Sequence, residues 1–207
     1  MSQPRAVLRL ALAAMLLAPV PAQAQMSQGY KFLEAIKKKD VEVINKMVSS
    51  SGAKTTAGDI IINTRDITSG DTALHIMIGK GELAWVNFLI QRGADVNLKN
   101  FSGTTPLWLA INTGFTDAAI VLVAKGARVN DPGPAGETPI IAAVHRKNLD
   151  LVRTLIASGA DPTKADNSGR TAVDYATLNG KGTLLDEITA AAAKAKAKKV
   201  KSYGPSL

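Results

Sequence analysis

Short apolar stripes recur along the chain at the spacing of an α-helix. In each stripe, apolar residues stand three or four positions apart, and mostly polar or small residues fill the positions between them. Three such stripes are Leu83, Val86, Leu89 and Ile90; Ala119, Leu122 and Val123; and Leu149, Val152, Leu155 and Ile156. Helices of roughly ten residues do not persist alone in water. The pattern therefore predicts short helices that pack side by side against one another.

A further short helix is predicted before each stripe. At Thr105-Pro106, threonine can cap a helix whose first residue is proline, a position where the missing N–H is not needed. The same dipeptide returns at Thr138-Pro139, and Gly126 can end the helix that carries the second stripe. Each unit thus reads as two short antiparallel helices, and the segments between units read as hairpin-like turns.

The units repeat every 33 residues. One set of glycines is followed two residues later by threonine, and a second set is followed directly by alanine. The first set is Gly70, Gly103, Gly136 and Gly169, with Thr72, Thr105, Thr138 and Thr171; the second is Gly93, Gly126 and Gly159, with Ala94, Ala127 and Ala160. Internal repetition at this period is typical of a stacked array of helical units. The chain is predicted to be an all-α solenoid.

The repeated segments resemble ankyrin repeats. Gly103-Thr-Thr-Pro-Leu-Trp108 is similar to the Gly-x-Thr-Pro-Leu-His core of that family, and Gly93-Ala-Asp-Val-Asn97 is similar to its closing turn. The likeness is strong over residues 68 to about 185. It implies an ankyrin-repeat solenoid of stacked helix-turn-helix units, with about five repeats including an irregular N-terminal one. It also implies that His75, at the family's histidine position, makes a structural hydrogen bond between adjacent turns.

Residues 25–67 form the predicted irregular N-terminal capping repeat. Its inner helix is expected over 32–36 and its outer helix over 41–48, with Gly52-Ala53 as the closing turn. About eight extra residues, 54–61, then form an insertion. A binding loop and a tolerated surface loop are both open interpretations of this insertion.

Residues 68–190 contain the predicted ankyrin repeats and a C-terminal cap. Residues 184–201 read as one Ala/Lys-rich helix, whose first turns, with Leu184, Leu185 and Ile188, are expected to close the stack. The stripe ends near Ala193, and residues 191–207 form a basic Ala/Lys-rich tail. The tail is either a solvated helix or a basic arm for an acidic partner or a membrane surface.

The first 24 residues have the pattern of a cleaved signal peptide. Arg5 and Arg9 precede a short apolar run, and Ala22-Gln23-Ala24 is a small-x-small cleavage site. The chain contains no cysteine, which fits an oxidising compartment. We therefore expect export to a bacterial periplasm, with secretion as the alternative.

Charge does not indicate a nucleic-acid partner. Of the formal net charge of +8, two units belong to Arg5 and Arg9 and five to the lysines of 194–201, which leaves one for residues 25–193. The repeat body is close to neutral, so the high pI describes the tail, and no nucleic acid is expected to bind.

The sequence offers no recognisable catalytic or metal-binding constellation. The two histidines, His75 and His145, occupy different positions in the repeat and lack metal-ligand spacing, and no histidine is placed beside a marked serine nucleophile. Gly180-Lys-Gly-Thr183 lacks the first glycine of a phosphate loop. We expect no cofactor, no metal and no enzymatic activity.

The family resemblance implies that partners bind the concave face formed by the turn tips and the ends of the inner helices. The matching positions are Asp71, Lys80, Lys99, Phe101, Thr104, Asn112, Thr113, Pro134, Glu137, His145, Arg146, Asn167, Arg170 and Leu178. Phe101 is the strongest anchor candidate, although an isolated surface aromatic without a role is an equally open interpretation. Trp108 and Ile141 replace the family histidine, and Trp108 and Trp85 are expected to fill the core.

The expected function is protein binding by a monomeric, non-enzymatic module, with another periplasmic protein as the partner. The alternative is a tether or spacer whose basic C-terminal tail engages an anionic membrane or cell-wall surface.

Overall fold

The computed structural model describes residues 28–49, 61–180 and 182–202, and side chains up to residue 197. Within these residues the chain is helical and contains no strand. The inner helices are α1 (Gln28–Lys38), α4 (Ala73–Gly79), α6 (Pro106–Asn112), α8 (Pro139–His145) and α10 (Ala172–Leu178). The outer helices are α2 (Val41–Ser49), α5 (Leu83–Gln91), α7 (Thr116–Ala124), α9 (Leu149–Ala157) and α11 (Thr183–Ser202).

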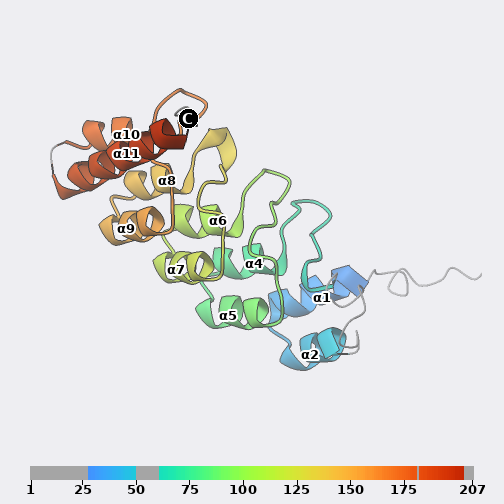
Figure 1. The fold of residues 1–207 in the computed structure, drawn as a ribbon. Coiled ribbons are helices and arrows are strands. Elements are labelled where there is room, and N and C mark those ends of the chain that lie inside the picture. The colour runs from blue at the N-terminus through green and yellow to red at the C-terminus, as the bar shows by residue number, and fades with distance from the viewer. Residues whose placement is uncertain (1–27, 50–60, 181, 203–207) are drawn as a thin grey trace, which may run out of the picture.

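The helix pairs stack in sequence order as two layers (Figure 1). The inner helices α1, α4, α6, α8 and α10 pack one against the next, and so do the outer helices α5, α7, α9 and α11. The turns between pairs project away from the outer layer, past the inner helices (Figure 1). The predicted all-α solenoid is confirmed, because each helix buries its apolar side against the next repeat.

The inner helices begin as the sequence predicts. Thr105 Oγ1 accepts a hydrogen bond from the Trp108 N–H (3.1 Å), with Pro106 in the first helical position. Thr138 caps α8 and Thr171 caps α10 in the same way. A cap of this kind satisfies an N–H that has no partner inside the helix.

After each inner helix the chain turns in the left-handed conformation. Gly81, Gly114 and Gly180 have φ of 71°, 75° and 95° at this position. In the first and fourth repeats the equivalent residues are Lys39 and Lys147, with φ of 58° and 52°. A side chain is strained in this conformation, whereas glycine is not. The fold therefore imposes the turn even where the sequence does not favour it.

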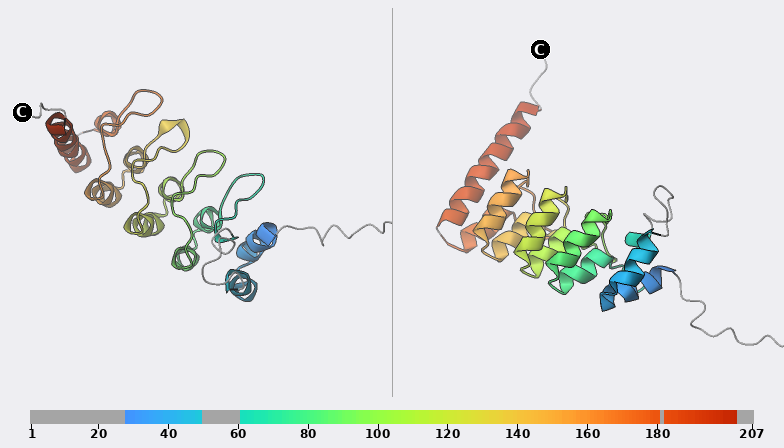
Figure 2. Two further views of the ribbon diagram at one scale, coloured as in Figure 1. Left: turned by 45° about the vertical axis from the view of Figure 1, so that its right-hand side comes forward. Right: turned by 90° about the horizontal axis from the view of Figure 1, so that it is seen from below.

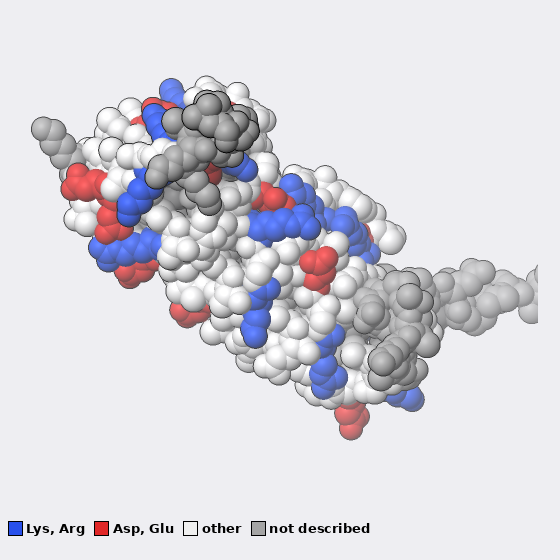
Figure 3. All heavy atoms as spheres, in the orientation of Figure 1, with Lys and Arg blue, Asp and Glu red and all other residues white. Residues whose placement is uncertain are grey.

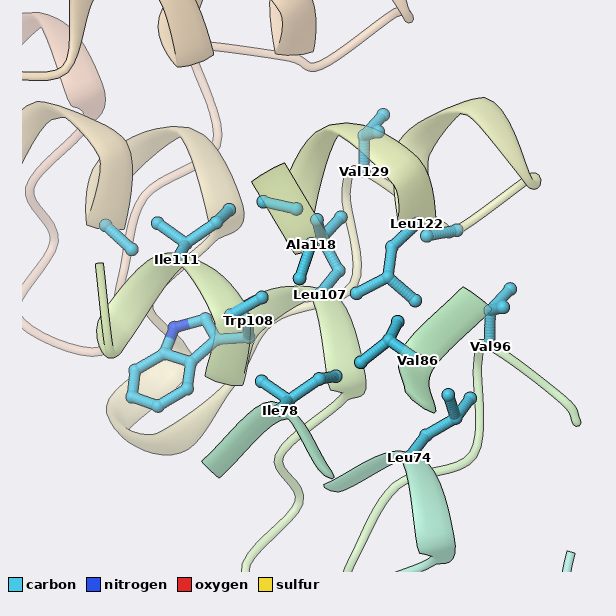
Figure 4. Close-up of a cluster of buried hydrophobic side chains, with 14 of the residues drawn as sticks. Leu74, Ile78, Val86, Val96, Leu107, Trp108, Ile111, Ala118, Leu122 and Val129 are labelled. Atoms are coloured by element: carbon cyan, nitrogen blue, oxygen red, sulfur yellow. The ribbon is translucent and has the colours of Figure 1, made fainter. Parts of the chain in front are cut away.

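The core runs between the two layers through the length of the stack. Figure 4 shows Leu74 and Ile78 of α4, Leu107 and Ile111 of α6 and Leu122 of the outer layer in one cluster; all five are essentially inaccessible to solvent. Burying one such side chain contributes about 1.5–3 kcal/mol. Neighbouring repeats share this core. A single repeat could not bury the apolar side chains of its helices without the repeat beside it.

Asn63 joins the first repeat to the second. Asn63 Oδ1 accepts the Asp95 N–H (2.8 Å), as Asn97 accepts the Arg128 N–H and Asn130 accepts the Asp161 N–H. Ile62 is buried at the position held elsewhere by Val96. Asn63 therefore takes the place that Asn97 and Asn130 hold in later repeats, while the closing turn predicted at Gly52-Ala53 lies outside the described residues.

The extra residues of this repeat lie between α2 and Asn63. Fourteen positions separate the end of α2 at Ser49 from Asn63, whereas six separate the end of α5 at Gln91 from Asn97. The difference of eight positions agrees with the number of extra residues predicted, and the predicted insertion lies outside the described residues except for Ile61.

α11 closes the other end of the stack. Ile188 and Ala192 are buried, Leu184 and Leu185 pack against the core, and Glu187 accepts two hydrogen bonds from Arg153 of α9 (2.8 and 2.6 Å). The prediction of one continuous capping helix is confirmed. At 20 residues α11 is about twice as long as its neighbours, and it extends beyond them (Figure 2).

Candidate functional site

The candidate binding surface consists of the four turn tips and the adjoining ends of the inner helices. We call it the turn face: the tips are residues 66–71, 100–104, 133–137 and 166–170, and the helix ends are residues 79–80, 112–113, 145–146 and 178–179. This surface carries the predicted site residues except Lys99, which immediately precedes the second tip.

Three of the four tips are built around one side-chain oxygen. Asp66 Oδ1 accepts the N–H groups of Thr68 and Ser69, and Asn100 Oδ1 accepts those of Ser102 and Thr104. Asp166 plays the same part in the last tip. Short polar side chains favour such turns because they replace missing backbone partners. These bonds to N–H groups lower the pKa of Asp66.

His75 ties the first of these tips to the second. Its Nε2 donates to the carbonyl oxygen of Thr104 (2.9 Å), and its Nδ1 accepts from the Thr72 hydroxyl (2.9 Å) and N–H (3.3 Å). Burial lowers the pKa of His75, against the opposing effect of the bond to Thr104. The family-based prediction of a structural hydrogen bond between turns is confirmed.

Trp108 replaces this hydrogen bond by packing. Its ring lies over Gly133, where an added Cβ would come within 2.6 Å of three indole carbons. The side chain is 8% exposed, which confirms its predicted place in the core, and its Nε1 is buried with no hydrogen-bond partner among the described residues. Position 133 corresponds to Asp66, Asn100 and Asp166 in the other tips. It is glycine in the third tip, because any side chain there would collide with the indole.

The first two tips expose apolar side chains. Ile67 is 87% exposed and Phe101 is 64% exposed. The Phe101 ring rests on Gly70, where an added Cβ would lie 2.6 Å from the ring, and its N–H donates to the Ser69 carbonyl (3.0 Å). Sequence reasoning found Phe101 but missed Ile67. The 33-residue period places Thr68 at this point. Ile67 takes the place of Phe101 only because the first tip has one more residue between Asp66 and Gly70 than the second has between Asn100 and Gly103.

Arg65 and Lys99 immediately precede these two tips in the chain, and Lys80 follows α4. The Lys80 ammonium donates to the Lys37 carbonyl (2.8 Å), and the Lys99 ammonium donates to the Pro132 carbonyl (3.3 Å). Arg65 is exposed beside the first tip. Figure 3 shows Lys and Arg side chains over the turns that precede α4 and α6, with acidic side chains between them. Asp71 is half-buried and accepts from Asn100 Nδ2 (2.8 Å).

The last two tips carry polar side chains that bind one another. His145 Nδ1 lies 2.7 Å from Glu137 Oε1, and its ring meets the Tyr175 ring edge-to-face at 4.4 Å between centroids. The Tyr175 hydroxyl donates to Asp166 Oδ2 (2.7 Å), and the Arg170 guanidinium lies 5.8 Å from the Tyr175 ring. Hydrogen bonds from Ser168 and Tyr175 strongly lower the pKa of Asp166. His145, one of the predicted binding-face residues, is thus part of a network.

The remaining predicted residues divide into exposed and buried. Asn112, Thr113, Pro134, Arg146 and Leu178 are exposed on the turn face, and so is Asn167, whose side chain packs over Gly136. Thr104 was predicted to contact a partner, but it is only 5% exposed, so its side chain is not available for binding. The reason is that the chain turns inward there toward the cap of α6, and its carbonyl is needed by His75.

An apolar depression on the outer layer was not found from the sequence. It has a volume of about 260 Å³ and is lined by Val41, Ala84, Trp85 and Phe88, with Arg92 stacked 4.8 Å from the Phe88 ring. Trp85 is half-buried: it packs against the core, as predicted, and it also lines this depression. The α5 helix is apolar on most sides, so the stripe alone did not tell which residues face inward.

Some other predictions concern segments that the structure does not describe, or features that can be checked only in the described residues. The signal peptide and residues 50–60 lie outside the described residues. In the described parts of the chain, no helix is both long and apolar enough to cross a membrane. Over the same residues, no cluster of three or more His, Cys, Asp or Glu side chains is placed to hold a metal ion.

Comparison with known families agrees with the architecture. Residues 32–133 match a family model described as ankyrin repeats (3 copies), and residues 122–176 match one described as ankyrin repeats (many copies). The two matches together span residues 32–176, from α1 to α10. No curated protein matches the chain.

Proposed function

Because this chain belongs to the ankyrin-repeat family, we propose that it is an exported, non-enzymatic module that binds another protein through its turn face. Ankyrin repeats generally mediate protein–protein interactions and are typically not enzymes. The finer parts of the proposal are the use of this face, a periplasmic partner and a monomeric state.

The observation that carries the proposal is the exposed pair of apolar tips on a rigid support. Ile67 and Phe101 project from turns whose backbones are held by Asp66, Asn100 and His75. Large apolar side chains are usual anchors of protein interfaces, and fixed anchors lose little conformational freedom on binding. A standard interface needs roughly 800 Å² from each partner, which an extended face of four tips can supply.

Export rests on the N-terminal sequence. Arg5 and Arg9, the short apolar run after them and the Ala22-Gln23-Ala24 site support cleavage after Ala24. The absence of cysteine is compatible with an oxidising compartment. Fractionation of cells would test this part, with the mature chain beginning at Gln25 expected in the periplasmic fraction.

A tether is the second candidate function. α11 continues beyond the stack, and after the buried Ala192 it carries exposed Lys194 and Lys196 followed by three more lysines in the sequence. A basic helix of this kind is attracted to anionic surfaces, and salt weakens that attraction. In this case the repeats serve as a spacer rather than as the binding surface.

One capture experiment separates the two functions. The mature chain from Gln25 is used as bait in a periplasmic extract beside two variants, one with Phe101→Ala and Arg146→Ala, the other ending at Ala193. Retention of a protein partner by the truncated chain but not by the double variant supports protein binding through the turn face. If the captured material is instead lost with the tail and released by salt, the tether takes its place.

A further inference from the structure

We propose that the first two tips receive a protein segment in which a large apolar side chain is flanked by carboxylates. The docking site consists of Ile67 and Phe101, with Arg65, Lys80 and Lys99 around them. This inference rests on the proposed function, and it specifies which half of the turn face binds and what chemistry the partner presents.

The apolar part of the site is held in place before binding. The Phe101 ring lies against Gly70, and the Phe101 N–H bonds to Ser69 of the preceding tip, so two successive tips are joined at this point. Ile67 stands two residues before Ser69 and is the most exposed large apolar side chain among the described residues. A partner side chain that covers both would remove apolar area from water without first ordering the turns.

The charged part of the site favours a negative partner. Among the described residues, Arg65, Lys80 and Lys99 take part in no ion pair, and the ammonium groups of Lys80 and Lys99 bond only to backbone carbonyls in the bonds that the structure shows. Of the neighbouring carboxylates, Asp66 is already paired with the Lys37 ammonium (3.7 Å), and Asp71 bonds to the neutral amide of Asn100, so the three cations outnumber the one unpaired carboxylate. Positive charge therefore remains for a partner to neutralise.

A peptide with separate carboxylates around an apolar residue fits this site better than a uniformly anionic surface. Asp66 directly follows Arg65, and Asp71 lies beside Asn100 of the second tip; both would repel a continuous layer of phosphates. A segment with separate carboxylates around an apolar residue can place its charges beside the cations and avoid these two aspartates. Protein is thus favoured over lipid or nucleic acid at this site.

The other half of the turn face offers less to such a partner. Glu137, His145, Asp166, Arg170 and Tyr175 bind or stack on one another, so a partner would have to displace contacts that already exist. Leu178 is 71% exposed at that end and serves as a matched control residue, because it has the same apolar character and similar exposure.

The test is a selection of displayed random 12-residue peptides against the chain from Gln25 to Leu207. Enriched sequences are expected to combine a large apolar residue with two or more Asp or Glu residues. A synthetic peptide from this set should lose tenfold or more in affinity with Ile67→Ser and Phe101→Ser together. It should keep its affinity with Leu178→Ser. Lys80→Gln with Lys99→Gln should weaken binding several-fold and reduce its dependence on salt.

Two controls distinguish a lost binding site from an unfolded variant and from binding to a membrane. Circular dichroism and thermal melting of each variant check that the fold is retained, and vesicles of anionic phospholipid check for a membrane partner. Enrichment of basic or neutral peptides, no enrichment, or vesicle binding that requires Ile67 and Phe101 would overturn the inference.

Two further outcomes separate the inference from the proposed function. Loss of peptide binding with Leu178→Ser but not with the double variant overturns the inference, while binding through the turn face stands. Binding that no turn-face substitution affects overturns both.

Discussion

The two halves of the turn face have the same backbone fold, but their side chains make different contacts. In the first half, apolar side chains at the tips of the turns face solvent, and nearby lysines bond to carbonyl oxygens rather than to carboxylates. In the second half, aromatic, acidic and basic side chains bind one another across two repeats. The difference teaches that a repeat motif determines where side chains project, but their mutual contacts decide which remain available.

The link within the first half also differs from the link that joins the two halves. His75 joins its turn to the next through a buried hydrogen bond to Thr104, whereas Trp108 lies on Gly133 and uses contact area instead. A hydrogen bond is directional and depends on protonation, while packing depends on shape. The first link should therefore be sensitive to pH and the second to side-chain volume.

The largest expected effect is the loss of Trp108. Trp108→Ala should destabilise the fold by about 3–5 kcal/mol, because a buried aromatic is removed and a cavity remains above Gly133. Chemical denaturation followed by circular dichroism measures this change.

Trp85→Ala is the matched control for this substitution. Because Trp85 is half-buried on the outer layer, its removal should have a clearly smaller effect. Equal effects of the two substitutions would show that Trp108 does not link the turns.

His75→Gln should lower the free energy of unfolding by about 1–3 kcal/mol near neutral pH. The glutamine side chain cannot bond to Thr72 and to the Thr104 carbonyl at the same time. The wild-type protein should also lose stability as pH falls below about 6.5. The pKa of His75 is lowered in the fold, so the unfolded chain binds the proton first and acid favours unfolding.

Denaturation at pH 7.5, 6.5 and 5.5 tests this pH dependence. The decline should be shallower in His75→Gln than in the wild type. Asp66, Asp166 and Asp174 do not interfere in this range, because their pKa values are lowered from 3.8. An unchanged slope in the variant would assign the pH dependence to other groups.

Tyr175→Phe contrasts directly with Ile67→Ser. The phenylalanine removes the hydroxyl bonded to Asp166, so it should destabilise the fold modestly and raise the pKa of Asp166 toward its ordinary value. Ile67→Ser should stay within about 0.5 kcal/mol of the wild type, because Ile67 makes little buried contact. Thermal melts and NMR titration of the carboxyl measure the two effects. A larger loss from Ile67→Ser would reverse the comparison between the halves.

The last expected effect is a small gain in stability. Lys147→Gly should stabilise the fold by about 0.5–1 kcal/mol, because glycine relieves the strain at a φ of 52°. Lys125→Gly makes the same change at a φ of −96° and should give no gain. Urea denaturation of the two variants provides the measurement, and a loss from Lys147→Gly would mean that its side chain supports the turn.

Much of the fold could be predicted because its signals are local. The Thr-Pro caps, the closing glycines and the apolar stripes act within one helix or one turn, and they placed α6, α7 and α8 near their observed bounds. The single long helix after Gly182 was equally readable from its composition. The period of 33 residues then determined the stacking, since helices this short must share a core.

What the sequence by itself determined is therefore the architecture: helical pairs, their order, the place of His75 in an inner helix, and the turn that carries Phe101. Only the tertiary structure decided the register of Asn63, the burial of Thr104, the exposure of Ile67 and the network around Tyr175. These features join residues about one repeat apart or depend on which side a helix presents to its neighbour. Spacing within a single repeat cannot specify them, because they are settled only when the repeats pack together.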